Sequence, residues 1–165
     1  MFTFAYSARD EGEIGAGEGE GYTVNVPLPP FAGDEAYRFV FEELISRLVE
    51  RFEPELVIRN GGSDPHFSDE ITQLGLTLEG FRWIGRSVRE IAEICGGKEV
   101  DLICSGYNPQ VMPRTWSALI SGLADVHFDL EEKFPLTSEK TWRVEEVENT
   151  VKKVKGNLGP YWGSL

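Results

Sequence analysis

Residues 59–70, RNGGSDPHFSDE, place two glycines, two aspartates, a proline and a histidine directly after a short apolar run. The run predicts a buried strand over residues 55–59 that ends at the paired glycines. A glycine turn lets the backbone approach a ligand closely, and Asp64 follows this one. The stretch therefore predicts either an ordinary strand-to-helix loop or one wall of an active site.

The same order of strand, glycine turn and polar loop recurs further along the chain. Residues 77–95 have the apolar spacing of a helix, opened by a threonine and closed by the glycine pair at 96–97. KEVDLICSGYNP (98–109) predicts a second strand and loop, and TWSALISGLAD (115–125) predicts a helix entered through Pro113. This alternation predicts an α/β fold with a mostly parallel sheet flanked by helices.

The N-terminal third predicts two extended segments and a further helix. FTFAYSA (2–8) and YTVNVPLPP (22–30) have the composition of strands, and the glycine- and acid-rich stretch 9–21 between them predicts a loop. GDEAYRFVFEELISRLVERF (33–52) predicts a helix with Asp34 as its N-cap. Its expected apolar face consists of Phe39, Leu44, Leu48 and Phe52.

We expect one domain over residues 1–165, with a lead-in over 1–30, a core over 31–125 and a helical tail over 126–165 that ends in an aromatic, glycine-rich segment. The chain has 165 residues, of which 41% are hydrophobic, which is enough for a sizeable core. Two isolated cysteines, Cys95 and Cys104, predict buried thiols in a reducing compartment.

The charge balance argues against nucleic-acid and membrane binding. Sixteen basic residues against 28 acidic ones give a net charge of −12. Such a field repels phosphate backbones and anionic lipid. The one basic cluster, VKKVKG (151–156), follows acidic residues and is typical of a solvated helix end. No stretch has the roughly 20 apolar residues of a membrane span, so we expect a soluble cytoplasmic protein.

Two loops are the candidates for chemistry, because ligands of open α/β sheets bind at the carboxyl ends of the strands. In the first loop, residues 60–70, the sequence allows three roles for Asp64: a metal ligand, a general base or the cap of a turn. With His66 and Asp69 it forms Asp-x-His-x-x-Asp, whose donors suit zinc, so a self-contained metal site is one hypothesis. In the second, residues 105–113, Tyr107 is either a neutral donor to an oxyanion or a packing residue.

Five motifs in order resemble a known family. GEGEGYTVNVPLPP with GDEAY, PELVIRNGGSDPH, LGLTLEGF, GGK and SGYNP are similar, in order and spacing, to the C-terminal part of the histone deacetylase superfamily. The bacterial and archaeal branch, with its acetoin-utilisation deacetylases and acetylpolyamine amidohydrolases, fits best. The resemblance runs from about Gly17 to about Gly122, and no motif is assigned beyond Asp125.

The resemblance implies an arginase-like α/β fold and hydrolysis of acetyl-amide bonds with one bound zinc. It implies that Asp64 is a zinc ligand and that Tyr107 polarises the substrate carbonyl and stabilises the oxyanion. Gly106 matches the turn that presents this tyrosine, although the family often has more glycine at Cys104 and Ser105. His66 and Asp69 match positions that we expect to be structural.

One part of the family pattern is absent from this sequence. The paired histidines, and the Asp-x-His that contributes two zinc ligands, belong to an N-terminal portion with no counterpart here. We therefore expect little or no activity from the chain alone, and a half-sheet whose open edge and apolar face associate with an N-terminal deacetylase half or with a second copy. The expected substrate is an acetylated small molecule or protein. The alternative hypothesis is a non-catalytic interaction module with the same fold.

Overall fold

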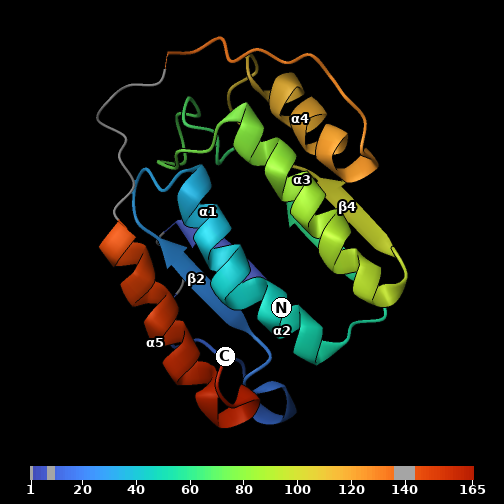
Figure 1. Cartoon of the computed structure of the whole chain (residues 1–165). Helices are drawn as coiled ribbons and strands as arrows, with labels where there is room; N and C mark the ends of the chain where they lie inside the picture. Colours follow the sequence, from blue (N-terminus) through green and yellow to red (C-terminus); the bar gives the residue numbers. More distant parts are fainter. Residues whose placement is uncertain (1, 7–9, 136–143) are drawn as a thin grey trace.

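The computed structural model describes residues 2–6, 10–135 and 144–165. Its strands form two parallel pairs (Figure 1). In the first pair, β1 (Phe2–Tyr6) lies beside β2 (Val24–Leu28), and in the second, β3 (Val57–Gly61) lies beside β4 (Glu99–Ile103). The expected α/β class with parallel strands is confirmed, and β3 lies two residues further along the chain than predicted.

Helices separate and cover these strands. They are η1 (Gly17–Gly19), α1 (Asp34–Val40), η2 (Phe41–Ile45), α2 (Ser46–Phe52), α3 (Leu78–Ala92), η3 (Glu93–Cys95), α4 (Met112–Ala124) and α5 (Val144–Trp162). The single helix expected over 33–52 is continuous but contains the π-helical turn η2 between α1 and α2. In Figure 1, α1, α2 and α3 lie in front of the strands.

Local capping explains the bounds of α3. The Thr77 hydroxyl accepts a hydrogen bond from the Gly80 N–H at 3.2 Å, as an N-cap should. Gly96 ends the helical segment in the left-handed conformation, with φ of 70°. Both positions agree with the prediction from sequence.

Asp34 has a different role from the one predicted. The N-cap of α1 is Gly33, and Asp34 is the first residue of the helix. Its carboxylate instead accepts hydrogen bonds from the N–H and the hydroxyl of Thr77, at 2.9 and 2.6 Å. Asp34 therefore joins the start of α1 to the start of α3, because its best partner is distant in sequence and near in space.

Two other expectations about burial were wrong. Phe52 was placed on the apolar face of its helix, but its side chain is half-exposed beside Tyr22 and Trp162. Cys104 was expected to be buried, and it is exposed at the end of β4 with its thiol 2.7 Å from the Asn60 side-chain oxygen. Cys95 is buried as predicted.

One apolar core joins β2 to the helices that the structure describes. Its residues come from β2, from α1 through α2, and from α3, α4 and α5. α3 and α4 pack closely, since a Cβ on Gly122 would lie 2.0 Å from the Arg82 carbonyl oxygen. Four residues of α5 enter the same core: Val147, Val151, Val154 and Leu158. This packing keeps α5 helical through Gly156, Gly159 and Pro160, where the sequence predicted an irregular end.

The two faces of the β3–β4 pair differ. On one face Arg59 lies opposite Asp101, and the guanidinium forms two hydrogen bonds to the carboxylate, at 2.5 and 2.8 Å. The other face exposes three large apolar side chains, Ile58, Val100 and Leu102, with Ile58 61% exposed. A parallel sheet is normally covered on both faces, so this uncovered apolar face marks a surface for association.

The described residues contain no helix with the length and apolar character needed to cross a bilayer.

Candidate functional site

The loops after β3 and β4 meet at the carboxyl ends of their strands, as the sequence predicted. The Ser63 N–H donates to the Ser105 carbonyl at 2.7 Å, and the Cys104 N–H donates to the Gly61 carbonyl at 3.0 Å. A third link joins the Asn108 amide to the Ser68 carbonyl at 2.9 Å. The pairing of two neighbouring parallel strands therefore continues into the loops and holds them as one unit.

Two glycines permit this close approach. A Cβ on Gly62 would lie 2.2 Å from the Ser105 carbonyl oxygen, and a Cβ on Gly106 would lie 1.8 Å from the Ser63 hydroxyl oxygen. Gly106 also has φ of 147°, a conformation that other residues rarely adopt. The turn predicted to present Tyr107 thus requires glycine for two separate reasons.

Asp64 lies in the first loop with a half-buried side chain. The Ser105 hydroxyl donates a hydrogen bond to its Oδ1, and the Thr72 hydroxyl donates to its backbone carbonyl. In the described part of the chain, no group donates a hydrogen bond to its other oxygen, Oδ2. Burial, and then the charge of Asp64, raise the pKa of the Tyr37 phenol, so Tyr37 stays neutral next to this carboxylate.

Tyr107 lies in the second loop, and its side chain is 57% exposed. Its backbone is fixed, because its N–H donates to Oδ2 of Asp69 at 2.9 Å. The other oxygen of Asp69 accepts from the Ile71 N–H at 3.0 Å. Asp69 is only 7% exposed, so a buried carboxylate of the first loop sets the backbone of the residue predicted to polarise the substrate.

His66 is fully buried and points into the scaffold. Its Nδ1 accepts from the Ser68 N–H at 3.2 Å, so the proton of the neutral ring is on Nε2, which lies 3.2 Å from Oε2 of Glu132. The same Glu132 oxygen accepts from the Leu78 N–H at the start of α3. The ring also stacks on Phe67, with 4.4 Å between centroids.

Glu132 is a contributor that the sequence analysis missed. It belongs to the tail, where no motif was assigned, and it is one of several acidic residues in DLEEKF (129–134). No local pattern marks it, because its partners His66 and Leu78 are more than 50 positions away. The tail nevertheless contacts the loop that contains Asp64, through the hydrogen bond between Glu132 and His66.

The hypothesis of a self-contained metal site is wrong for the residues described. Within 2–6, 10–135 and 144–165, no three His, Cys, Asp or Glu side chains gather closely enough to hold a metal ion. Two of the three side chains have other hydrogen-bond partners. His66 is bonded to Glu132, and Asp69 accepts from the backbone N–H groups of Tyr107 and Ile71. Only Asp64 keeps a carboxylate oxygen without a described hydrogen-bond donor. Its donor chemistry fits the role of one ligand in a zinc site.

Comparison with known proteins identifies the family. The histone deacetylase domain matches residues 4–123. The chain belongs to the histone deacetylase family. A "Probable deacetylase" of Archaeoglobus fulgidus is 36% identical over 160 residues, which cover 91% of this chain and 44% of the relative. The acetoin utilization protein AcuC of Bacillus subtilis is 33% identical over 109 residues, 65% of this chain and 28% of the relative.

Solved structures of this histone deacetylase family have the same fold. The HDA15 HD domain superposes with a TM-score of 0.79 at 24% identity, covering 99% of this chain and 43% of that one. The histone deacetylase Clr3 superposes with a TM-score of 0.76 at 23% identity, covering 92% of this chain and 24% of that one. The deacetylase-like fold is therefore confirmed, and the likeness includes the tail. The chain spans less than half the length of these relatives.

Proposed function

We propose that the chain is part of a zinc-dependent deacetylase, to which it contributes one metal ligand, Asp64, and the carbonyl-polarising Tyr107. The observation that carries the proposal is the joining of the two loops. A carboxylate whose Oδ2 has no hydrogen-bond donor among the described residues and an exposed phenol follow adjacent parallel strands, and backbone hydrogen bonds join their loops. Membership of the histone deacetylase family supports the reaction class.

Asp64 would hold the zinc through Oδ2, while the Ser105 hydroxyl keeps Oδ1 in place. When bound, zinc supplies Lewis-acid polarisation of an amide carbonyl and activation of water as a nucleophile. Three protein ligands are usual in a catalytic zinc site, and this chain provides one of them. The other ligands and the general base would come from an N-terminal deacetylase half, without which the chain would have little or no activity.

Tyr107 would donate a hydrogen bond from its phenol to the acetyl carbonyl oxygen as negative charge develops there. The Asp69 carboxylate holds the Tyr107 backbone, and Gly106 provides the turn before it. Placement on a fixed backbone matters because a hydrogen-bond donor contributes most when it needs no reorganisation during the reaction.

The substrate would be an acetyl-lysine side chain or another acetylated amine. The net charge of −12 favours cationic substrates such as lysine-rich peptides or polyamines over anionic ones. The same charge argues against nucleic acid and anionic membrane as partners. A cytoplasmic location accords with this chemistry and is part of the proposal.

Reconstitution tests the proposal. The chain is mixed with zinc and the separately produced N-terminal remainder of the Archaeoglobus fulgidus relative, and amide hydrolysis is followed on an acetyl-lysine peptide and on an acetylated polyamine. We expect hydrolysis by the mixture and none by either part alone. Asp64→Ala should lower the zinc content of the complex, whereas Asp129→Ala, at an exposed aspartate, should leave it unchanged. Equal hydrolysis by the mixture and the separate parts would refute the catalytic role.

The second candidate is a non-catalytic interaction module, which the uncovered apolar face of β3 and β4 favours. This function predicts a stoichiometric complex whose affinity is the same with zinc and with a chelator. The deacetylase predicts hydrolysis that stops when the metal is removed and returns when zinc is restored. Removing and restoring zinc therefore distinguishes the two candidate functions.

A further inference from the structure

The segment that follows α4 lies against α3 and α4 as a strap, residues 125–132. Figure 1 shows it running back along α4. Side chains of both helices hold its backbone. Arg82 of α3 donates to the Phe128 carbonyl at 2.8 Å, and Arg114 of α4 donates to the Glu131 carbonyl. The strap is therefore fixed to the helices up to its last residue.

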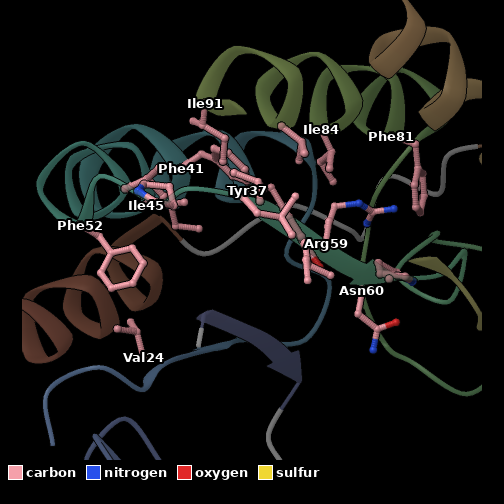
Figure 2. Close-up of a pocket in the computed structure, with 18 of the residues that line it drawn as sticks. Val24, Tyr37, Phe41, Ile45, Phe52, Arg59, Asn60, Phe81, Ile84 and Ile91 are labelled. Carbon is pink, nitrogen blue, oxygen red and sulfur yellow. The ribbon is translucent and has the colours of Figure 1, made fainter. Parts of the chain in front are cut away.

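That last residue, Glu132, joins α3 to the loop that contains Asp64. Its Oε2 accepts a hydrogen bond from the Leu78 N–H in the first turn of α3, at 3.2 Å, and the Nε2–H of His66 donates to the same oxygen, also at 3.2 Å. The surroundings of the His66 ring are apolar on the side of Phe81, whose ring stacks with it at 6.2 Å between centroids. Phe81 belongs to α3 and lines the apolar groove shown in Figure 2. A buried N–H in such surroundings needs an acceptor, and Glu132 supplies it.

Ser68 and Asn108 extend this contact into the second loop. The Asn108 side-chain amide donates to the Ser68 hydroxyl at 3.3 Å, and the hydroxyl donates to Nδ1 of His66 at 2.8 Å. The oxygen of the same amide accepts from the Gln110 N–H at 3.0 Å, which fixes the orientation of the amide. Asn108, Ser68, His66 and Glu132 thus form a relay of three hydrogen bonds that all run in one direction and end on a carboxylate. In such a relay each bond polarises and strengthens the next.

The relay begins beside the residue proposed to polarise the substrate. Asn108 follows Tyr107 directly, and the Tyr107 N–H donates to Asp69. We propose that Glu132 is a positioning residue for the reaction, which acts through the relay to fix the backbone that carries Tyr107. This role rests on the proposed function of Tyr107, whereas the relay is a property of the fold. Positioning matters because a misplacement of about 1 Å can cost about a hundredfold in rate.

Two roles for Glu132 predict different results. If Glu132 only satisfies the Leu78 N–H at the start of α3, its removal should lower stability and leave the turn around Tyr107 unchanged. If it acts through the relay, its removal should also be detected at Asn108 and Tyr107, which belong to the other loop. Measurements at these two residues therefore separate positioning from simple stabilisation.

NMR of the chain alone tests the relay without any enzymatic assay. Glu132→Leu removes the acceptor at similar size, Glu132→Gln keeps an acceptor oxygen, and Glu131→Leu is the matched control, since the Glu131 side chain is exposed and its backbone carbonyl is what Arg114 binds. Glu132→Leu should shift the ring nitrogen signals of His66 and the side-chain amide signals of Asn108. It should also speed hydrogen exchange of the Tyr107 N–H about tenfold, as expected when about one hydrogen bond is lost. Glu132→Gln and Glu131→Leu should both resemble the unmodified chain.

The same variants are then assayed in the reconstituted complex with zinc and the N-terminal remainder of the Archaeoglobus fulgidus relative. Glu132→Leu should lower kcat about ten- to hundredfold while KM and zinc content stay the same, because only the placement of Tyr107 changes. Glu132→Gln should restore most of the activity, and Glu131→Leu should retain all of it.

Ser68→Ala breaks the relay at its centre and leaves the bond between Glu132 and Leu78 intact. It should also lower kcat, and it carries the test if Glu132→Leu does not fold. Adding Ser68→Ala to Glu132→Leu should lower kcat no further, because residues of one network are not additive. Thermal melting of each variant establishes that it is folded at the assay temperature.

The outcomes separate the positioning role from the proposed function. Unchanged Asn108 signals in Glu132→Leu, or a kcat for Ser68→Ala equal to that of Glu131→Leu, would overturn the positioning role and leave the deacetylase function standing. Reduced stability of Glu132→Leu with a normal kcat would overturn it as well, and would assign Glu132 to the start of α3 alone. Faster Tyr107 exchange in Glu132→Leu, together with an unmodified complex that hydrolyses nothing, would uphold the relay and refute the deacetylase function.

Discussion

Asp69 connects the two loops of the site, and its removal should weaken both stability and catalysis. Its carboxylate accepts hydrogen bonds from the N–H groups of Tyr107 and Ile71, at 2.9 and 3.0 Å. A hydrogen bond to a charged group contributes about 1.5–3 kcal/mol. Ile71 is exposed, so water replaces its lost acceptor, and the Tyr107 bond dominates the cost. Asp69→Ala should therefore lower the free energy of unfolding by about 1.5–3 kcal/mol.

Urea denaturation followed by tryptophan fluorescence measures this change. With a slope of about 2 kcal/mol per M, the midpoint should fall by about 1 M. Asp69→Asn keeps one acceptor oxygen for two donors and should show about half of the loss. Asp129→Ala removes an exposed carboxylate and is the control, with an expected change within about 0.5 kcal/mol. If Asp69→Ala and Asp129→Ala have the same midpoint, the linking role assigned to Asp69 is wrong.

Gly122→Ala should lower the free energy of unfolding by about 1–3 kcal/mol, because the added methyl group meets the Arg82 carbonyl of α3. Gly156→Ala, at an exposed position of α5 with open space around it, should instead raise the free energy of unfolding by up to about 1 kcal/mol. Thermal melting compares the two variants, and equal melting temperatures would contradict the close packing of α3 against α4. The ammonium of Lys155 lowers the pKa of Glu43, so this pair stabilises the fold fully above the ordinary glutamate pKa of 4.5, and the contribution is lost as the pH falls from there through the lowered pKa of Glu43. Lys155→Met should thus be less stable than the unmodified chain at pH 7, and the difference should shrink as the pH falls below 4.5 and through the lowered pKa of Glu43, whereas a difference that stays constant over this range would exclude the ion pair as its cause.

Local features of the fold were predictable from the sequence. The bounds of α3 followed from Thr77 and Gly96, because capping depends on residues within a few positions of the helix end. The order of strands, loops and helices followed from apolar periodicity for the same reason. The two candidate loops could also be located, since the carboxyl ends of neighbouring parallel strands must lie together.

Contacts between distant residues were not predictable in this way. Asp34 binds Thr77, 43 positions later, and Glu132 binds His66 across 66 positions, so neither partnership leaves a pattern in the local sequence. Cys104 was expected to be buried because it is an isolated cysteine, but it is exposed, since the outer face of β4 has no cover in the described chain. The division of the strands into two pairs likewise depends on which edges meet in space.

The candidate site likewise combines residues that the sequence predicts with contacts between residues distant in the sequence. The resemblance to deacetylases predicts roles for Asp64 and Tyr107, and the structure places both on loops that glycine allows to touch. The residues that hold them, Ser105 and Asp69, form hydrogen bonds from one loop to the other. These hydrogen bonds join residues about 40 positions apart, so their positioning roles depend on the pairing of β3 with β4.

The most direct test of the account is the turnover of an acetyl-lysine peptide by the reconstituted complex carrying Tyr107→Phe. Tyr161→Phe, at another exposed tyrosine whose phenol contacts Glu20, is the matched control. We predict that Tyr107→Phe lowers kcat about a hundredfold or more while zinc content stays the same, because a hydrogen-bond donor to the oxyanion is lost. The control should retain full activity. A kcat for Tyr107→Phe equal to that of the control would contradict the assignment of Tyr107 and with it the proposed reaction.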